Sequence, residues 1–362
     1  MQLFSPAAAY GMLQYAAMRA QTIGTQQLMV VFLGIVVAIL LGGVLYLTSS
    51  IVLPFMVALF LAYLLDPLVR FLKHFGVPLA LSVCFALLVT FVFFGLMGLL
   101  FYTSAQSFVR EYPTYEPKLR ALMTTLTSRL EVASLSWQLS DLGQELSSAS
   151  LMRAALASLG TFVTFLGHLL LVLLFMVFIL LGQQRLPQRL HRAFGEEQAQ
   201  RITLVLQRIT HQIQTYLGTK ALLSLVTGVL VNLCLLALQV DFAVLWGALA
   251  FLLNFIPNVG APIATIPPIV VAILKFDTLM PVIWVLVSVT IIHVVIGVFI
   301  EPRLLGRSLH ISPLLVVLSL LFWGWLWGII GAVLAVPIMA TLKIVCENIP
   351  SLRFLSALMS DG

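Results

Sequence analysis

Charged side chains at the end of one long apolar segment are the first candidates for chemistry. Glu301 and Arg303 flank Pro302 directly after the apolar residues 278–300. Charges close to membrane depth usually pair with one another and face a cavity. We therefore expect Glu301 to be a proton- or cation-carrying carboxylate, Arg303 to be its partner, and Pro302 to fix the helix end between them. A helix end at the membrane surface with a local salt bridge explains the same residues as well, so both interpretations stay open.

A turn rich in proline, glycine and asparagine interrupts the apolar segment 242–274. Its residues are Asn254, Pro257, Asn258, Gly260 and Pro262. Irregular backbone at membrane depth is tolerated only inside protein or against a water-filled cavity, and such breaks are typical of the discontinuous helices of transporters. The two amide side chains and the free backbone groups of the helix ends could bind a polar solute. A plain turn between two helices is the alternative.

A second break lies in segment 312–344, which has the same length as segment 242–274. Glycines permit close helix approach here, and Gly328 and Gly331 follow a cluster of three tryptophans between residues 323 and 327. The tryptophans fit an aromatic belt at the membrane interface. Alternatively, they form the tip of a second hairpin that lines the solute path.

Three further titratable residues could relay protons. Asp66 precedes Pro67 at the expected end of a span, while His168 and His293 lie inside apolar spans. Histidine titrates close to neutral pH, so a relay is possible. The alternatives are a simple helix end at Asp66 and ordinary interhelical hydrogen bonds of the two histidines.

Composition places these residues in an all-α polytopic membrane protein. Of the 362 residues, 61% are hydrophobic and 9% are charged, against about 25% charged residues in soluble domains. Cys84, Cys234 and Cys346 are widely spaced, which argues against a disulfide framework or a metal site. We find no enzyme motif, nucleotide site or cofactor site. Transport energy would then come from an ion gradient or from the solute's own gradient.

The chain divides into apolar spans and polar connections, and Lys and Arg orient them by the positive-inside rule. The expected regions are a cytoplasmic N-terminal segment (1–27), three transmembrane helices (28–103), an extracytoplasmic amphipathic helical region (104–156), a fourth transmembrane helix (157–182), a cytoplasmic basic amphipathic helix (183–216), a transport core with broken helices or hairpins (217–344) and a cytoplasmic C-terminal tail (345–362). Both termini are thus expected in the cytoplasm.

The two broken segments decide the number of spans. As continuous helices each would reach about 50 Å, against a hydrocarbon core of about 30 Å. If both are re-entrant hairpins, Arg303 becomes cytoplasmic as the positive-inside tendency favours. We therefore expect six spans plus two hairpins, at 242–274 and 312–344, that enter from opposite faces. Eight conventional spans are the alternative.

Four segments of the chain resemble a known family. They are Ala62-Tyr-Leu-Leu-Asp66-Pro67, Phe255-Ile256-Pro257-Asn258-Val259-Gly260 with Pro262, Ile300-Glu301-Pro302-Arg303-Leu304-Leu305-Gly306, and Gly328-Ile-Ile-Gly331-Ala-Val-Leu-Ala-Val-Pro337. In this order they are similar to the autoinducer-2 exporter family of bacterial permeases, from about residue 28 to 350. The resemblance implies an inner-membrane protein that exports a small polar signalling molecule. It also implies a homo-oligomer, with pentamers described for the family.

Three functions follow from the residues and the resemblance together. The first is a secondary transporter that exports a small polar solute by alternating access, with its site at the hairpin tips near Asn258 and Gly328. The second is sodium (or other cation)/proton exchange through Glu301, Asp66 and the histidines, which some relatives in the family are assigned. The third is a non-transporting membrane scaffold. In each case the partners are the lipid bilayer and further copies of the chain, with no nucleic acid.

Overall fold

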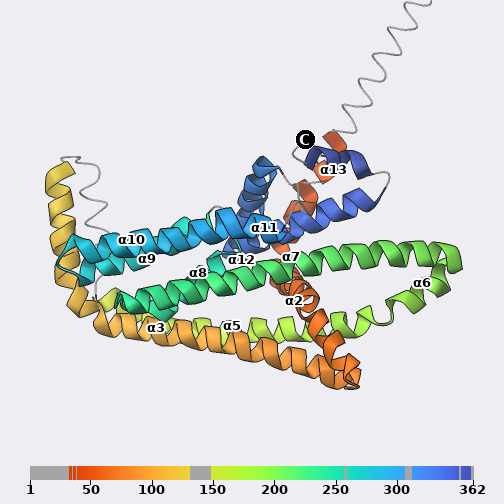
Figure 1. Ribbon diagram of the computed structural model, residues 1–362, viewed down its shortest axis with the longest axis horizontal. Helices are drawn as coiled ribbons and strands as arrows, with labels where there is room; N and C mark the ends of the chain where they lie inside the picture. The colour runs from red at the N-terminus through yellow and green to blue at the C-terminus, as the bar shows by residue number, and fades with distance from the viewer. Residues whose placement is uncertain are drawn as a thin grey trace, which may run out of the picture. The chain divides into compact units, whose positions relative to one another are not determined.

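Helices account for the regular structure of the computed structural model. It describes residues 32–34, 36–37, 39–130, 148–256, 259–305, 312–349 and 352–359, which fall into two units, 1–52 and 53–362. A short apolar helix covers Phe32–Leu47 in the first unit. The further elements are α2 (Ser49–His74), α3 (Leu79–Leu130), α5 (Ser148–Gln183), α6 (Leu186–Phe194), α7 (Glu196–Ala237), α8 (Ala243–Leu253), α9 (Gly260–Lys275), α10 (Leu279–Val294), the π-helix η1 (Val295–Ile300), α11 (Glu301–Leu305), α12 (Pro313–Asn348) and α13 (Arg353–Met359) (Figure 1).

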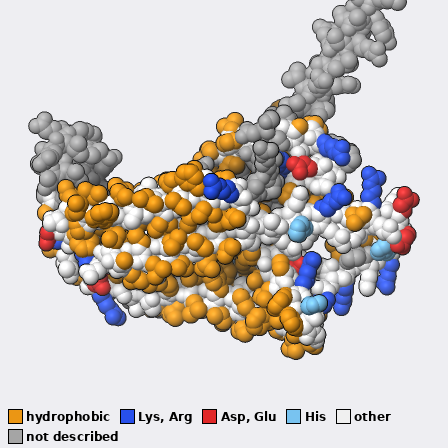
Figure 2. Space-filling view, viewed as in Figure 1, with side chains coloured by type: hydrophobic (Ala, Val, Ile, Leu, Met, Phe, Trp, Pro, Cys, Tyr) orange, Lys and Arg blue, Asp and Glu red, His pale blue; other side chains and the backbone are white. Residues whose placement is uncertain are grey.

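Six helices among the described residues are long and apolar enough to cross a membrane. They cover Ser49–His74, Leu79–Leu119, Thr164–Gln183, Glu196–Ala237, Leu279–Leu304 and Pro313–Asn348. Hydrophobic side chains cover most of the face over α3, α9 and α10, whereas Lys and Arg gather around α6 and the start of α7 (Figure 2). This surface suits contact with lipid tails, which need no polar partner. The expected all-α polytopic membrane fold is confirmed.

Several helices run further than the sequence suggested. α2 continues through Pro67 to His74, so Asp66 and Pro67 do not form a helix end. A proline removes only one main-chain hydrogen bond, and membrane helices tolerate this loss where neighbouring groups compensate. The third span and the polar segment after it form one helix, α3, up to Leu130. Residues 131–147 of the expected extracytoplasmic region lie outside the described residues.

The basic amphipathic segment before the fifth span is likewise part of a longer helix. α6 covers its first residues, and α7 then runs without interruption from Glu196 into the span. The apolar stripe that predicted a separate amphipathic helix is covered by this chain itself. Ile213 is buried in a cluster with Phe60 of α2 and Leu334 of α12. The stripe therefore serves internal packing as well as any membrane contact.

Both broken segments fold back on themselves as antiparallel hairpins. In the first hairpin α8 packs against α9. In the second, α12 changes direction at Trp327 and Gly328, whose backbone is not helical. The Ser319 hydroxyl donates to the carbonyl of Ala335 across the second turn, 3.1 Å away. The fold-back expected for segments 242–274 and 312–344 is present in both.

One hydrophobic core holds both hairpins together. It contains Leu253 and Ala264 of the first hairpin and Leu320 and Ala335 of the second, with Val231 of α7. Both hairpins also contact α7 directly. Within the unit 53–362, α7 is therefore the helix on which the two interrupted segments converge.

Candidate functional site

A buried polar face on α7 is the centre of the candidate site. Tyr216, Lys220, Ser224 and Thr227 are spaced by four, four and three residues, so they share one side of the helix, and all four are buried. The other side carries exposed apolar residues, among them Leu222, Leu225, Val226 and Val229. This inside-out pattern, with polar groups inward and apolar groups outward, is expected for a helix in contact with lipid.

Lys220 and Glu301 form an ion pair inside the protein, here called the central pair. The Lys220 ammonium lies 2.5 Å from Oε1 of Glu301, and the two side chains are 3% and 19% exposed. Losing one partner of a buried pair costs about 3–5 kcal/mol, because the other charge remains without compensation. The central pair therefore ties α7 to α11 across 81 positions of the chain.

The expected pairing of Glu301 with Arg303 is wrong. Among the described residues no ion pair joins them, and Arg303 is exposed on α11. Pro302 does not end the helix either, since Leu279–Leu304 is a single helical span. Side chains two positions apart lie on different sides of a helix, which directs Arg303 away when Glu301 faces α7.

A π-helical turn leads into Glu301. η1 covers Val295–Ile300, and the Glu301 amide donates to the carbonyl of Ile296, five positions earlier. π-helical turns are rare and frequently occur at functional sites. The carboxylate is thus presented at the end of an irregular turn in an otherwise regular span.

The turn of the first hairpin reaches the same face of α7. The Asn254 amide nitrogen donates to the Ser224 hydroxyl, 3.0 Å away. Ser224 follows Lys220 by one helical turn, so hairpin and central pair meet neighbouring positions. Pro257 and Asn258, also expected in the site, lie outside the described residues. Pro262 is exposed in the first turn of α9, where a proline costs no intrahelical hydrogen bond.

The two hairpins are closed in the same way by a glycine. A Cβ on Gly260 would overlap the carbonyl of Leu253, and one on Gly331 would overlap the carbonyl of Trp323. In each hairpin the glycine allows the second helix to begin in direct contact with the last turn of the first helix. Gly328 has a φ of +64°, a backbone conformation that favours glycine. These close approaches explain why both breaks need glycine.

The tryptophans surround the turn of the second hairpin. Trp327 is buried, its ring lies 4.7 Å from that of Trp323, and Trp325 is exposed. Two of the three rings thus pack inside the hairpin. Trp323 and Trp327 therefore fit the interpretation as the tip of the second hairpin. Trp325 is exposed, as a residue of an aromatic belt would be.

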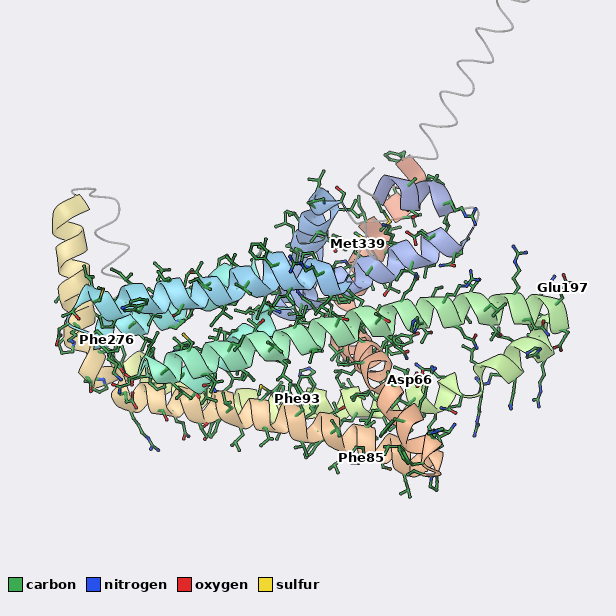
Figure 3. The ribbon with its side chains drawn as sticks, in the orientation of Figure 1. Asp66, Phe85, Phe93, Glu197, Phe276 and Met339 are labelled. Carbon is green, nitrogen blue, oxygen red and sulfur yellow. The ribbon has the colours of Figure 1, made fainter. Side chains whose placement is uncertain are left out.

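The three possible relay residues are not brought together. Asp66 lies on α2 close to α7 (Figure 3), where it pairs with Arg70 at 2.6 Å and accepts a hydrogen bond from Gln214. His168 is exposed on α5. His293 is buried in α10, and neither ring nitrogen has a partner among the described residues. No described hydrogen bond or ion pair joins any two of the three.

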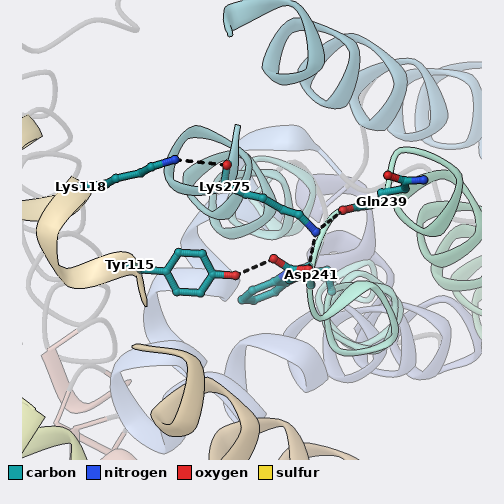
Figure 4. Close-up of polar contacts among 6 residues, drawn as sticks. Tyr115, Lys118, Gln239, Asp241 and Lys275 are labelled. Carbon is teal, nitrogen blue, oxygen red and sulfur yellow. Dashed lines mark hydrogen bonds and ion pairs between the residues drawn. The ribbon is translucent and has the colours of Figure 1, made fainter. Parts of the chain in front are cut away.

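A second polar cluster, here called the hairpin-base network, lies where the first hairpin begins and ends (Figure 4). Lys275, at the end of α9, bonds Asp241 at 2.5 Å and the carbonyl of Gln239 at 2.7 Å. The Tyr115 hydroxyl of α3 donates to the other oxygen of Asp241. The network therefore fastens the base of the hairpin to α3.

Lys118 extends the hairpin-base network to the loop after α9. Its ammonium lies 2.7 Å from Asp277 and 3.3 Å from the carbonyl of Lys275. The hydrogen bond and the charge of Lys118 lower the pKa of Asp277 below its ordinary value. Phe276, beside this loop, and Glu197, near the start of α7, lie at opposite ends of the helices in Figure 3. The network is thus remote from the basic end of the protein.

Sequence reasoning missed Lys220 and Ser224. Lys220 is the only charged residue between positions 217 and 238, and a lone charge in an apolar span indicates a functional position. Lys220 could therefore have been recognised from the sequence. The pairing of Lys220 with Glu301 could not, because the two residues lie in different helices whose packing the sequence pattern does not specify.

Comparisons with known proteins agree with this architecture. The model of the family described as "AI-2E family transporter" matches residues 33–351. "AI-2 transport protein TqsA" of Escherichia coli (strain K12) is 33% identical over 92% of this chain and 95% of its own length. A "Putative transport protein" of Haemophilus influenzae is 34% identical over 90% of this chain and 94% of its own. The suspected family is confirmed: the chain belongs to the AI-2E family of transporters.

Proposed function

We propose that this protein is a secondary transporter that exports a small polar solute, autoinducer-2 or a related molecule, across the bacterial inner membrane. The observation that carries the proposal is the convergence of two antiparallel hairpins on the buried polar face of α7. Both contribute to one hydrophobic core, and Asn254 of the first bonds Ser224 of that face. Interrupted helices that meet at a buried polar surface are the arrangement in which transporters bind their solutes.

The polar groups at this surface suit a solute that carries hydroxyl groups. The amide oxygen of Asn254 has no hydrogen-bond partner among the described residues, so it can accept a hydrogen bond. Lys220 supplies a cation and Glu301 an anion, each able to bond a neutral hydroxyl. The surrounding apolar core leaves a bound solute few other polar partners, which favours specific orientation.

Alternating access would expose this surface to one side of the membrane at a time. In our proposal the two hairpins are re-entrant from opposite faces, and both termini are cytoplasmic. The hairpins and α7 would move against a scaffold formed by α2, α3 and α5, in a homo-oligomer. Both hairpins have the same close glycine approach at their turn, which fits two related elements that act as a pair.

Counterflow in vesicles tests the transport proposal. The purified protein would be placed in lipid vesicles preloaded with unlabelled autoinducer-2, and entry of labelled autoinducer-2 would be followed. We expect rapid exchange, slowed at least about tenfold by Asn254→Ala, since one lost bond in a dry site is worth about 1.4 kcal/mol or more. Asn348→Ala is the matched control, because among the described residues the Asn348 side chain bonds only the carbonyl of Ile344 in its own helix. Equal exchange in vesicles without protein would contradict the proposal.

The topology has its own test at Arg303, which is exposed on α11. A single cysteine would replace Arg303 in a variant that lacks Cys84, Cys234 and Cys346. An impermeant thiol reagent would then be added to sealed vesicles of known orientation. Labelling from the cytoplasmic side agrees with six spans and two opposed hairpins. Labelling from the outer side alone requires eight conventional spans.

Cation/proton exchange is a second candidate, and the central pair is the observation that favours it. A partly buried carboxylate next to a buried ammonium could exchange a proton for a metal cation. This function predicts sodium-dependent proton movement in vesicles without any organic solute, abolished by Glu301→Gln. A scaffold function would be favoured instead if the wild-type protein showed neither counterflow nor sodium-dependent proton movement, and changes at Asn254 and Glu301 then had no effect.

A further inference from the structure

The central pair has an unused acceptor. Lys220 contacts Oε1 of Glu301, whereas Oε2 has no hydrogen-bond partner among the described residues. Glu301 is also the more accessible member, with 19% of its side chain exposed against 3% for Lys220. A carboxylate accepts about four hydrogen bonds when it is ionised. The pair therefore neutralises the carboxylate without saturating it.

We propose that Glu301 is the coupling site of this transporter, where a proton and a hydroxyl-bearing solute compete for the same carboxylate while Lys220 holds the carboxylate in place. This inference rests on the proposed transport function and adds the coupling ion to it. Export of the solute would then be driven by entry of protons.

The competition follows from hydrogen-bond chemistry. When Glu301 is ionised, Oε2 accepts a charge-assisted hydrogen bond from a solute hydroxyl, and the Lys220 ammonium can donate to the same solute. A proton on Glu301 converts that acceptor into a donor and removes the negative charge. The proton enters from outside as the solute leaves, and Glu301 releases it on the cytoplasmic side. No other reactant is needed, because the carboxylate is restored in each cycle.

The groups around Glu301 make it the proton-binding group of this site. α11 packs against α7 and η1. From α7, Lys220 bonds the carboxylate and Tyr216 interacts with it electrostatically. η1 contributes only apolar residues and glycine, and Arg303 of α11 is exposed. Among the described residues, no other carboxylate is ion-paired or hydrogen-bonded to Lys220.

The π-helical turn offers a route from protonation to movement. Glu301 begins α11 directly after η1, and its own amide closes the last π-type hydrogen bond. Release of the carboxylate from Lys220 removes the contact that holds this turn against α7. α7 in turn packs on both hairpins. A charge change at Glu301 is thus adjacent to the elements that would have to move.

The experiment measures proton and solute movement in the same vesicles. A pH-sensitive dye would be trapped inside vesicles that contain the full-length protein, in sodium-free buffer, and autoinducer-2 would be added outside. We expect solute entry to move protons outward, at about one per solute, if one carboxylate carries them. Glu301→Gln should reduce the solute-evoked proton signal at least about tenfold and make any residual counterflow independent of pH. Glu301→Asp should retain a pH-dependent signal.

Two variants serve as controls. Asp241→Asn removes a carboxylate from the hairpin-base network. This variant should keep the solute-evoked proton signal. Lys220→Met combined with Glu301→Gln removes both charges, so it tests the inference even if Glu301→Gln alone fails to fold. A proton signal that persists in this double variant overturns the inference.

The remaining outcomes separate the inference from the function on which it rests. Net solute entry through the wild-type protein without proton movement, or a Glu301→Gln variant whose transport keeps the wild-type pH dependence, overturns the coupling site and leaves the transporter proposal standing. Proton movement evoked by sodium alone overturns solute coupling in favour of cation exchange. Absence of counterflow in the wild-type protein overturns the transporter proposal, and the coupling site with it.

Discussion

The central pair and the hairpin-base network both join distant segments through a lysine and an acid, but their surroundings differ. Lys220 and Glu301 are 3% and 19% exposed, whereas Lys275 and Asp241 are 32% and 28% exposed. Water can hydrate the charge that remains when Lys275 or Asp241 is replaced. Water can hardly reach the charge that remains when Lys220 or Glu301 is replaced. Burial, more than the bond length of 2.5 Å that both pairs share, therefore decides what each pair does. The first suits ion coupling and the second suits fastening.

Removing one member of the central pair should produce the largest effect. Lys220→Met leaves the Glu301 carboxylate without its described cation, and we expect a loss of about 3 kcal/mol in the free energy of unfolding. Thermal unfolding of the purified protein in detergent would measure the change. The control is Lys220→Met with Glu301→Gln, which should recover most of the stability while transport stays lost. Equal stability of the single and double variants would show that the pair is not effectively buried.

Removing the lysine of the hairpin-base network should cost less. Lys275→Met deletes the bonds to Asp241 and to the Gln239 carbonyl, and we expect a loss of about 1–2 kcal/mol, because both side chains are partly hydrated. Counterflow should continue in the surviving protein. A loss of stability as large as that of Lys220→Met would contradict the contrast between the two clusters.

A smaller change within the same network tests the role of α3. Tyr115→Phe removes only the hydroxyl that donates to Asp241, which keeps Lys275 as its partner. We expect about 0.5–1 kcal/mol of destabilisation, the usual range for one partly buried hydrogen bond. Combining Tyr115→Phe with Lys275→Met in a double-mutant cycle would measure the coupling. Strict additivity would show that the two bonds to Asp241 act independently.

The smallest effect should come from Lys118 and Asp277 at the rim of the network. Asp277 is 87% exposed at its side chain, so solvent and salt screen the pair. Because Lys118 lowers the pKa of Asp277 in the folded protein, the contribution is fully present above the ordinary value of 3.8 and disappears as the pH falls through the lowered value. Wild type and Asp277→Asn should therefore differ slightly at neutral pH in low salt and converge as the pH falls through the lowered pKa of Asp277. A difference that grows in acid would contradict this sign.

Local features of the sequence were enough to predict the class of the protein and the positions of its two helix interruptions. Long apolar runs indicate membrane-spanning helices, because the exposure of such runs to water is unfavourable. Proline and glycine act on their own backbone, so the breaks near Pro257 and Gly328 could be placed without knowing any distant contact. Segments 242–274 and 312–344 are each interrupted and too long for one crossing of the hydrocarbon core, which together with the positive-inside tendency suggested hairpins, and the fold-back is present in both.

Helix ends and side-chain partners could not be predicted from local sequence patterns alone. Pro67 was expected to end α2, yet the helix continues to His74 with Val69 buried in a core that also contains Met176 of α5. The apolar stripe around Ile213 was expected on a separate helix and instead belongs to α7. In both cases packing against distant residues extends a helix beyond the point where its own residues would favour a break.

The sequence alone determined that a membrane protein of this family carries a carboxylate, Glu301, at the end of an apolar span and an asparagine-bearing turn in a broken helix. Only the tertiary structure decided that Glu301 pairs with Lys220 rather than Arg303, and that Asn254 meets Ser224 one turn further along α7. The physical reason is geometric. Residues two apart on a helix point to different sides, so a partner must come from whichever helix packs opposite, and that packing is set by contacts across the whole unit.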